Sequence, residues 1–148
     1  MYTTSAVAPV FIVHGLAHAG LLVGAGLTTP GSRIILVSSE AGSIALRHAK
    51  EGGGLYGHHA SKAALNMAGK LLALDLADRR VVVSIVHPGF MRTELTKSVG
   101  FDAHWDEGGA VTPDVAAKSL VEWAEKLDMS KSGQYWAPRG PSTFLHVP

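Results

Sequence analysis

Two short apolar runs, Arg33 to Ser38 and Val81 to Val86, constrain the fold more than any other feature of the sequence. Both are continuous rather than alternating, and both are rich in β-branched residues, which is typical of strands buried on both faces. A shorter run, Gln134 to Ala137, predicts a third strand, and the tail from Pro138 is expected to be loop. Strands of this kind occur in sheets that helices cover on both sides.

Helical patterns alternate with these strands. They run from about Ala6 to Leu22, from Tyr56 to about Asp78, and from Pro113 to about Leu127, whereas Phe90 to Val111 is irregular. Strands that alternate with helices predict a parallel sheet with right-handed crossovers. We therefore expect one domain spanning residues 1–148, of the α/β class: a doubly wound, Rossmann-like sheet of three parallel strands with helices on both faces.

The N-terminal segment carries no charge, since the first charged side chain is Arg33. Glycines and two histidines, His14 and His18, interrupt this segment, so we expect a helix buried in a core or a subunit interface rather than a membrane span. A net charge of +1 gives no basis for binding nucleic acid or membranes. The chain has no cysteine, which is compatible with a reducing compartment, and we expect a soluble, cytoplasmic protein.

Three motifs lie at the predicted ends of these elements: ILVSSEAG after the first strand, HHASKAALN opening the second helix, and HPGFMRT after the second strand. Together, in this order and spacing, they resemble the C-terminal half of the short-chain dehydrogenase/reductase family. The resemblance implies a catalytic serine at Ser39 and a catalytic lysine at Lys62. It also implies that Pro88, Gly89 and Thr93 form the segment that lies against the nicotinamide of the cofactor.

Two positions depart from the family pattern. His58 stands four residues before Lys62, where the family has its catalytic tyrosine, and Ser5 stands where the first helix usually supplies an asparagine. Four residues turn a helix by about 400°, so His58 and Lys62 share a face, whereas the six residues from Tyr56 turn it by about 600°. Tyr56 reaches the pocket only if the helix begins after it, so His58 is the better substitute for the tyrosine.

The cofactor-binding half of the family pattern is missing from the sequence. No strand is followed by the Gly-rich turn that seats a pyrophosphate on a helix N-terminus, and VGAGL follows a helix instead. We therefore expect a truncated fold that lacks the N-terminal nucleotide-binding half and uses no cofactor.

The predicted catalytic residues are His58, Ser39 and Lys62, with Tyr56 as a further candidate. A neutral imidazole beside an ammonium group is suited to accept a proton, while serine and lysine stabilise a developing oxyanion. This set predicts a cofactor-independent lyase, isomerase or cyclase that acts on a small oxygenated metabolite. Two alternatives remain: a catalytically inactive interaction protein, and a fragment of an NAD(P)-dependent oxidoreductase.

The irregular segment between the second strand and the third helix is expected to bind substrate. Its candidate substrate-binding residues are Phe90, Met91, Thr93, Phe101 and Trp105. His14 and His18 have the i, i+4 spacing of zinc ligands but no acidic or thiol residue near them, so we expect no metal ion.

The predicted sheet leaves one edge of the strand Arg33 to Ser38 without a neighbour, and unpaired apolar edges favour association. The first helix has no charge, and the second has a stripe of small residues, Ala60, Ala63, Ala64 and Ala68. We therefore expect a homodimer or larger homo-oligomer, with no partner besides its small-molecule substrate.

Overall fold

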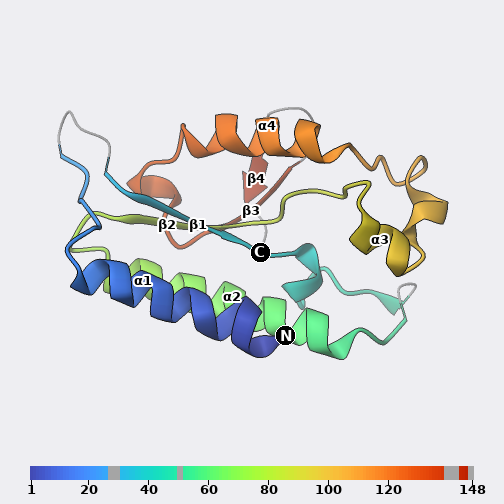
Figure 1. Ribbon diagram of the computed structural model, residues 1–148, viewed down its shortest axis with the longest axis horizontal. Helices are drawn as coiled ribbons and strands as arrows, with labels where there is room; N and C mark the ends of the chain where they lie inside the picture. Colours follow the sequence, from blue (N-terminus) through green and yellow to red (C-terminus); the bar gives the residue numbers. More distant parts are fainter. Residues whose placement is uncertain (27–30, 50–51, 139–143, 147–148) are drawn as a thin grey trace.

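The computed structural model describes residues 1–26, 31–49, 52–138 and 144–146. The described chain forms three layers, with a sheet between helices on both faces (Figure 1). The π-helical turn η1 (Thr3–Val7), helix α1 (Ala8–His18) and helix α2 (Tyr56–Asp75) cover one face. Helix α4 (Pro113–Ala124) covers the other face, so the predicted α/β class with helices on both sides is confirmed.

The sheet has four strands in the order β1-β2-β3-β4. Strands β1 (Arg33–Val37), β2 (Val82–Val86) and β3 (Tyr135–Pro138) are parallel, as predicted. Strand β4 (Phe144–His146) pairs antiparallel with β3, so the prediction of three strands followed by a loop is wrong. Three residues are too short for a recognisable pattern, and β4 is defined by its pairing alone.

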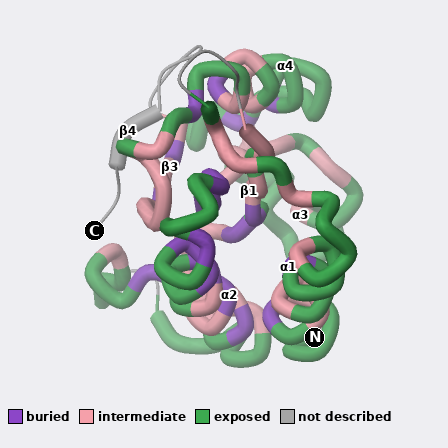
Figure 2. The backbone as a smooth tube through the Cα atoms, turned by 90° about the vertical axis from the view of Figure 1, so that its left-hand side faces the viewer, coloured by how far each residue is buried: buried purple, intermediate pink, exposed green. Residues whose placement is uncertain are grey.

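Strand β2 is buried along its whole length, because its side chains pack into two hydrophobic cores, one on each face of the sheet. Val83 and Ile85 belong to the core under α1 and α2, whereas Val82 and Val86 pack with Trp123 and Leu127 on the side of α4. Figure 2 shows the buried residues on the strands and on the helix faces turned toward the sheet. The continuous apolar run thus correctly predicted burial on both faces.

The first helix is less buried than the sequence predicted. Within η1 and α1 only Ala6 and Val13 are buried, whereas Phe11 is 73% exposed and Ile12 is 61% exposed. Placement in the protein core is therefore wrong for most of this helix. In the described part of the chain, no helix has the length and apolar character needed to cross a membrane.

The segment predicted to be irregular contains helix α3 (Glu94–Ser98) and the 3₁₀ turn η4 (Phe101–His104). Helix α3 begins with a capping box, in which the side chains of Thr93 and Thr96 each bond the other's backbone N–H. Such a short helix depends on its cap rather than on an apolar stripe, so hydrophobic periodicity could not reveal it.

Helix α2 approaches the sheet closely at Gly69. A Cβ atom there would lie 2.5 Å from Cγ1 of Ile85 and 2.9 Å from Cδ1 of Leu36. Both of these side chains are buried in the core, so neither has room to move aside. Glycine at this position lets α2 pack directly on β1 and β2.

We expect Gly69→Ala to lower the free energy of unfolding by about 1–3 kcal/mol, because the added methyl group overpacks the core. Gly15→Ala is the matched control, since Gly15 lies within α1 and a Cβ atom there would meet nothing within 4 Å. That control should gain about 0.5–1 kcal/mol from helix propensity alone. Urea unfolding measures both; equal stabilisation by the two substitutions would show that the packing at Gly69 is not restrictive.

Candidate active site

The candidate site lies where β1 ends and α2 begins. After β1 the chain continues through buried Ser38 to Ser39, whose Oγ accepts a hydrogen bond from the Ala41 N–H at 3.2 Å. This bond caps the 3₁₀ turn η2 (Glu40–Gly42). Because Ser39 uses its oxygen as an acceptor here, its hydroxyl hydrogen can be donated to a ligand.

A close backbone contact holds η2 on the first part of α2. A Cβ atom at Gly42 would lie 2.6 Å from the carbonyl carbon of Lys62 and 2.7 Å from the nitrogen of Ala63. Only glycine permits this approach, since a side chain would meet backbone atoms that cannot rotate away. The contact places Ser39 beside the helix that carries His58 and Lys62.

Two side-chain hydrogen bonds tie α2 to the end of β1. Lys62 Nζ donates to the Val37 carbonyl at 3.1 Å, and Ser38 Oγ donates to Oδ1 of Asn66, one turn beyond Lys62. Neither Ser38 nor Asn66 was among the residues predicted from the sequence. The i, i+4 spacing of Asn66 from Lys62 was the signal that would have found it.

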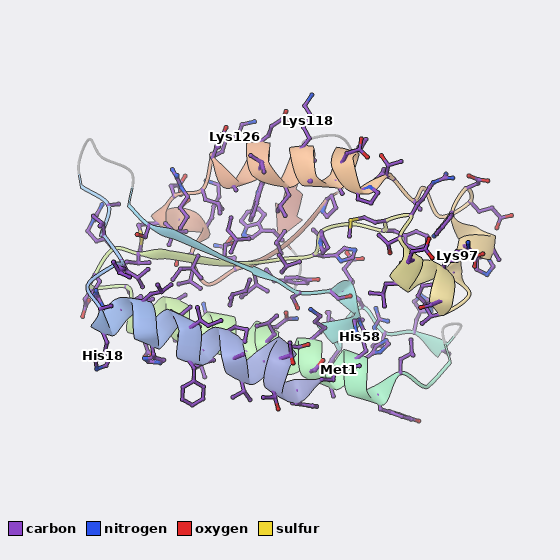
Figure 3. All side chains as sticks on the ribbon, viewed as in Figure 1. Met1, His18, His58, Lys97, Lys118 and Lys126 are labelled. Carbon is purple, nitrogen blue, oxygen red and sulfur yellow. The ribbon has the colours of Figure 1, made fainter. Side chains whose placement is uncertain are left out.

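His58 lies at the start of α2, beside the loop that follows β1 (Figure 3). Its pKa is lowered from 6.5, chiefly by partial burial, then by the positive charge of Lys62 and by His59. Burial also lowers the pKa of Lys62. At neutral pH the imidazole of His58 is therefore uncharged and able to accept a proton.

An open pocket of about 780 Å³ borders this site, and we call it the His58 pocket. Its lining is mostly apolar with a few polar groups. It is lined by Ser39, Ala41, Gly42, Ser43, Ile44, Arg47, Gly52, Gly53, Gly54, Leu55, Tyr56, His58, His59, Ala60, Ala63 and Phe101. The structure thus brings together four of the predicted site residues: Ser39, Tyr56, His58 and Phe101. Sequence reasoning missed Arg47 and His59, and no motif surrounds Arg47 that could have indicated it.

Tyr56 and Ser5 differ in their relation to this pocket. Tyr56 is the first residue of α2, so it is helical, and it lies at the pocket rim with 80% of its surface exposed. Ser5 lies in η1, half-buried, and is not among the lining residues. Because Tyr56 is helical, it does not share the helix face of Lys62, whereas His58, four residues before Lys62, does.

The remaining predicted site residues do not line the His58 pocket. Lys62 lies one helical turn from His58, and the Phe90 ring contacts Phe101 edge-on at 6.4 Å between centroids. Met91 forms an isolated bridge with Val111.

Thr93 and Trp105 have structural roles near α3. Thr93 caps the helix, and Trp105 donates its indole N–H to Oγ1 of Thr96 at 3.2 Å. The Arg92 guanidinium lies 5.9 Å from the centre of the Trp105 ring. These contacts stabilise the segment of α3 and η4, which places Phe101 at the pocket.

Comparison with known proteins gives similarities to dehydrogenases and reductases. A curated relative from Rhodococcus sp. (strain AD45), 1-hydroxy-2-glutathionyl-2-methyl-3-butene dehydrogenase, is 34% identical over 119 residues, which cover 80% of this chain and 48% of that protein. The chain thus spans about half the length of this relative.

Solved structures show the same relationship. Carbonyl reductase Sniffer of D. melanogaster is 26% identical with a TM-score of 0.68, and the match covers 92% of this chain and 52% of that one. A short-chain dehydrogenase/reductase from Burkholderia multivorans with bound NADP is 27% identical with a TM-score of 0.61, covering 95% and 52% of the two chains.

These relatives correct the functional interpretation of the sequence. They are dehydrogenases and reductases, and one of them holds NADP, so the interpretation as a cofactor-independent lyase, isomerase or cyclase is wrong. That interpretation rested on the missing Gly-rich turn, which bears on how a nucleotide is held rather than on the reaction type. The family model for short chain dehydrogenases matches residues 5–103, most of the chain, and the chain therefore belongs to the short-chain dehydrogenase family.

Proposed function

We propose that the chain forms the C-terminal, catalytic half of an NAD(P)-dependent oxidoreductase that interconverts an alcohol and a carbonyl compound. The observation that supports this most directly is the shared site of Ser39 and His58, which line one pocket, with Lys62 one helical turn away. These residues stand at the positions of the family's catalytic serine, tyrosine and lysine. The relatives named above act as dehydrogenases or reductases.

The described residues fit one end of the cofactor better than the other. Ser39, Lys62 and the turn at Gly89, whose φ of 101° requires glycine, are suited to hold the nicotinamide end. By contrast, no strand among the described residues leads through a short glycine turn directly into a long helix: β1 leads into a 3₁₀ turn, and β2 leads through Gly89 to the five-residue helix α3. We therefore propose that the pyrophosphate is held by protein outside the described residues.

The open edge of β1 is the place where such protein would join. In a parallel ladder alternate residues bond to the neighbouring strand, and the Ser38 N–H donates to the Val86 carbonyl at 2.7 Å. The peptide groups of Arg33, Ile35 and Val37 consequently point away from β2. Within the described sheet no strand lies on that side, so a further parallel strand has hydrogen-bonding groups to pair with.

In the proposed reaction, His58 and Ser39 act on the same substrate oxygen. Ser39 donates a hydrogen bond to the alcohol oxygen, and the neutral imidazole of His58 removes the hydroxyl proton. Ser39, Lys62 and the turn at Gly89 would hold the nicotinamide end of the cofactor, which would supply the hydride-transfer chemistry at the carbinol carbon. Lys62 disfavours the protonated imidazole, and a base that is neutral at physiological pH favours alcohol oxidation over carbonyl reduction.

We expect kcat/KM for alcohol oxidation with NAD(P)⁺ to rise with pH and to level off above an apparent pKa below 6.5, since His58 acts only when neutral. Lys62→Met should lower the plateau and move the rising limb to higher pH, because removal of the ammonium group raises the pKa of His58. A pH–rate profile of both proteins is the measurement. If kcat/KM of Lys62→Met rises over the same pH range as that of the wild type, Lys62 does not influence the pKa of His58.

We expect His58→Ala to lower the rate of alcohol oxidation by about 10² to 10⁴, the usual contribution of a general base. Tyr56→Phe is the matched control, since Tyr56 lines the same pocket but lies two residues away on the helix. It should keep most of the activity. Steady-state assays across a panel of secondary alcohols with NAD⁺ and NADP⁺ test this on protein that includes the part proposed to hold the pyrophosphate. Such a wild type without turnover on any of the alcohols would contradict the proposed function.

We further propose that two copies associate through α1 and α2. Phe11 and Ile12 on α1, and Met67, Leu71 and Leu74 on α2, are all more than half exposed. No charged residue precedes Arg33, so two copies of α1 would not repel one another. Exposed apolar side chains gathered on two neighbouring helices, one of them without charged residues, are typical of subunit interfaces.

We expect the wild type to sediment as a dimer or larger oligomer at micromolar concentration. Phe11→Asp should shift it toward monomer, because association would bury a charge without a partner. Leu95→Asp is the control, since Leu95 is 71% exposed on α3, away from both helices. Sedimentation velocity distinguishes these results: a monomeric wild type, or equal effects of the two substitutions, would rule out this interface.

A further inference from the structure

His59 is a polar group of the His58 pocket that the proposed reaction does not use. It follows His58 on α2, it lines the same pocket, and the centroids of the two imidazole rings lie 5.8 Å apart. Both residues are half-buried. The pocket thus has a second imidazole group beside the one that we propose as the base.

A hydrogen bond fixes the tautomer of the neutral His59 ring. Nδ1 lies 3.1 Å from the Leu55 carbonyl oxygen, which can only accept, so Nδ1 carries the hydrogen and donates it. A neutral imidazole has one N–H group, and Nε2 is therefore left with a lone pair. No hydrogen bond to Nε2 occurs among the described residues. His59 accordingly offers the pocket an acceptor and no further N–H donor.

The backbone that accepts this hydrogen bond has an unusual conformation. Leu55 precedes α2 with a φ of 47°, in the left-handed region that large apolar residues rarely adopt. Its carbonyl also accepts the backbone N–H groups of His58 and His59, at 2.9 and 3.0 Å. Residues that their surroundings hold in such conformations are concentrated at functional sites. The Leu55 carbonyl therefore anchors both the first turn of α2 and the ring of His59.

The rest of the pocket limits the kind of donor that can reach Nε2 of His59. Ile44, Leu55 and Phe101 line the pocket with large apolar side chains that are 88%, 52% and 43% exposed. Lys62 lies one helical turn from His58, and its positive charge disfavours an ammonium group on a ligand. An uncharged hydroxyl group on an apolar body matches both features.

We infer that His59 binds a second hydroxyl group of the substrate, on the carbon atom next to the reacting one, so that the substrate is a vicinal diol with an apolar body. A hydroxyl oxygen lies about 2.8 Å from the atom that accepts its hydrogen bond. Rings 5.8 Å apart can therefore each accept from one of two hydroxyl groups on adjacent carbon atoms. The first hydroxyl faces Ser39 and His58, and the second donates to Nε2 of His59. This assignment names the substrate class of the proposed oxidoreductase and rests on that function for the word substrate, but the binding site at His59 does not.

Two probes that differ in a single group test the inference. Styrene glycol has a hydroxyl group where α-ethylbenzyl alcohol has a methyl group, and the two molecules are otherwise the same. At about pH 8, where an imidazole is ordinarily uncharged, we expect wild-type protein to bind the diol about three- to tenfold more tightly, the effect of one hydrogen bond. Titrations followed by ¹H–¹⁵N NMR of the histidine rings, without cofactor, measure both affinities. The Nε2 resonance of His59 should move toward that of a hydrogen-bonded nitrogen with the diol but not with the mono-alcohol.

Two substitutions at His59 separate the roles of its ring nitrogens. His59→Asn keeps an N–H group near the position of Nδ1 for the Leu55 carbonyl but removes the acceptor at Nε2, so it should lose the preference for the diol. His59→Gln places an amide oxygen near the position of Nε2 and should keep part of the preference. His18→Asn is the control, because His18 lies at the end of α1, far from His58 (Figure 3). It should bind both probes as the wild type does.

The inference is overturned if the wild type binds the two probes equally or binds neither, a result that does not depend on whether any variant folds. It is also overturned if a folded His59→Asn protein keeps the preference for the diol. Failure of the oxidoreductase assay leaves these binding results unaffected. Conversely, equal binding of the two probes leaves the His58 and pH predictions in place, so the two proposals can fail separately.

Discussion

The burial of β2 on both faces is the constraint on which the rest of the structure depends. All five of its residues are buried, with β1 and β3 on its edges, α2 on one face and α4 on the other. The parallel pairing brings the carboxyl ends of β1, β2 and β3 to one side of the sheet. That is the side on which ligands bind in sheets of this type, and the polar residues after β1 and the start of α2 meet there.

Three contacts then convert this arrangement into a site with defined chemistry. The Gly42 backbone lies against α2 at Lys62, Ser38 bonds Asn66, and Lys62 bonds the Val37 carbonyl. Each contact joins β1 or the segment after it to α2, so the proposed catalytic serine and histidine come from two elements that are fixed to one another. Partial burial and the nearby ammonium group of Lys62 lower the pKa of His58 and favour its neutral, proton-accepting form.

Local patterns in the sequence were sufficient for the three parallel strands, the three longer helices and the face shared by His58 and Lys62. They could not predict β4 or α3, because the first is defined by pairing with β3 and the second by its cap. Arg47 was missed for a related reason, since its place at the pocket depends on two backbone carbonyls in a loop without a pattern. The reaction class was predicted wrongly because a missing nucleotide-binding segment was given more weight than the retained motifs, which carried the family relationship.

The hydrogen bond between Lys62 and the Val37 carbonyl has a consequence for the behaviour of the chain in solution. Val37 is the last residue of β1, and its carbonyl points to the open edge. Strand edges with free acceptors act as templates for intermolecular β-sheet growth, and natural proteins often block them with lysine. Lys62 occupies the final acceptor of this edge with a charged group. The ammonium group that lies near His58 therefore also limits aggregation at this open edge of the sheet.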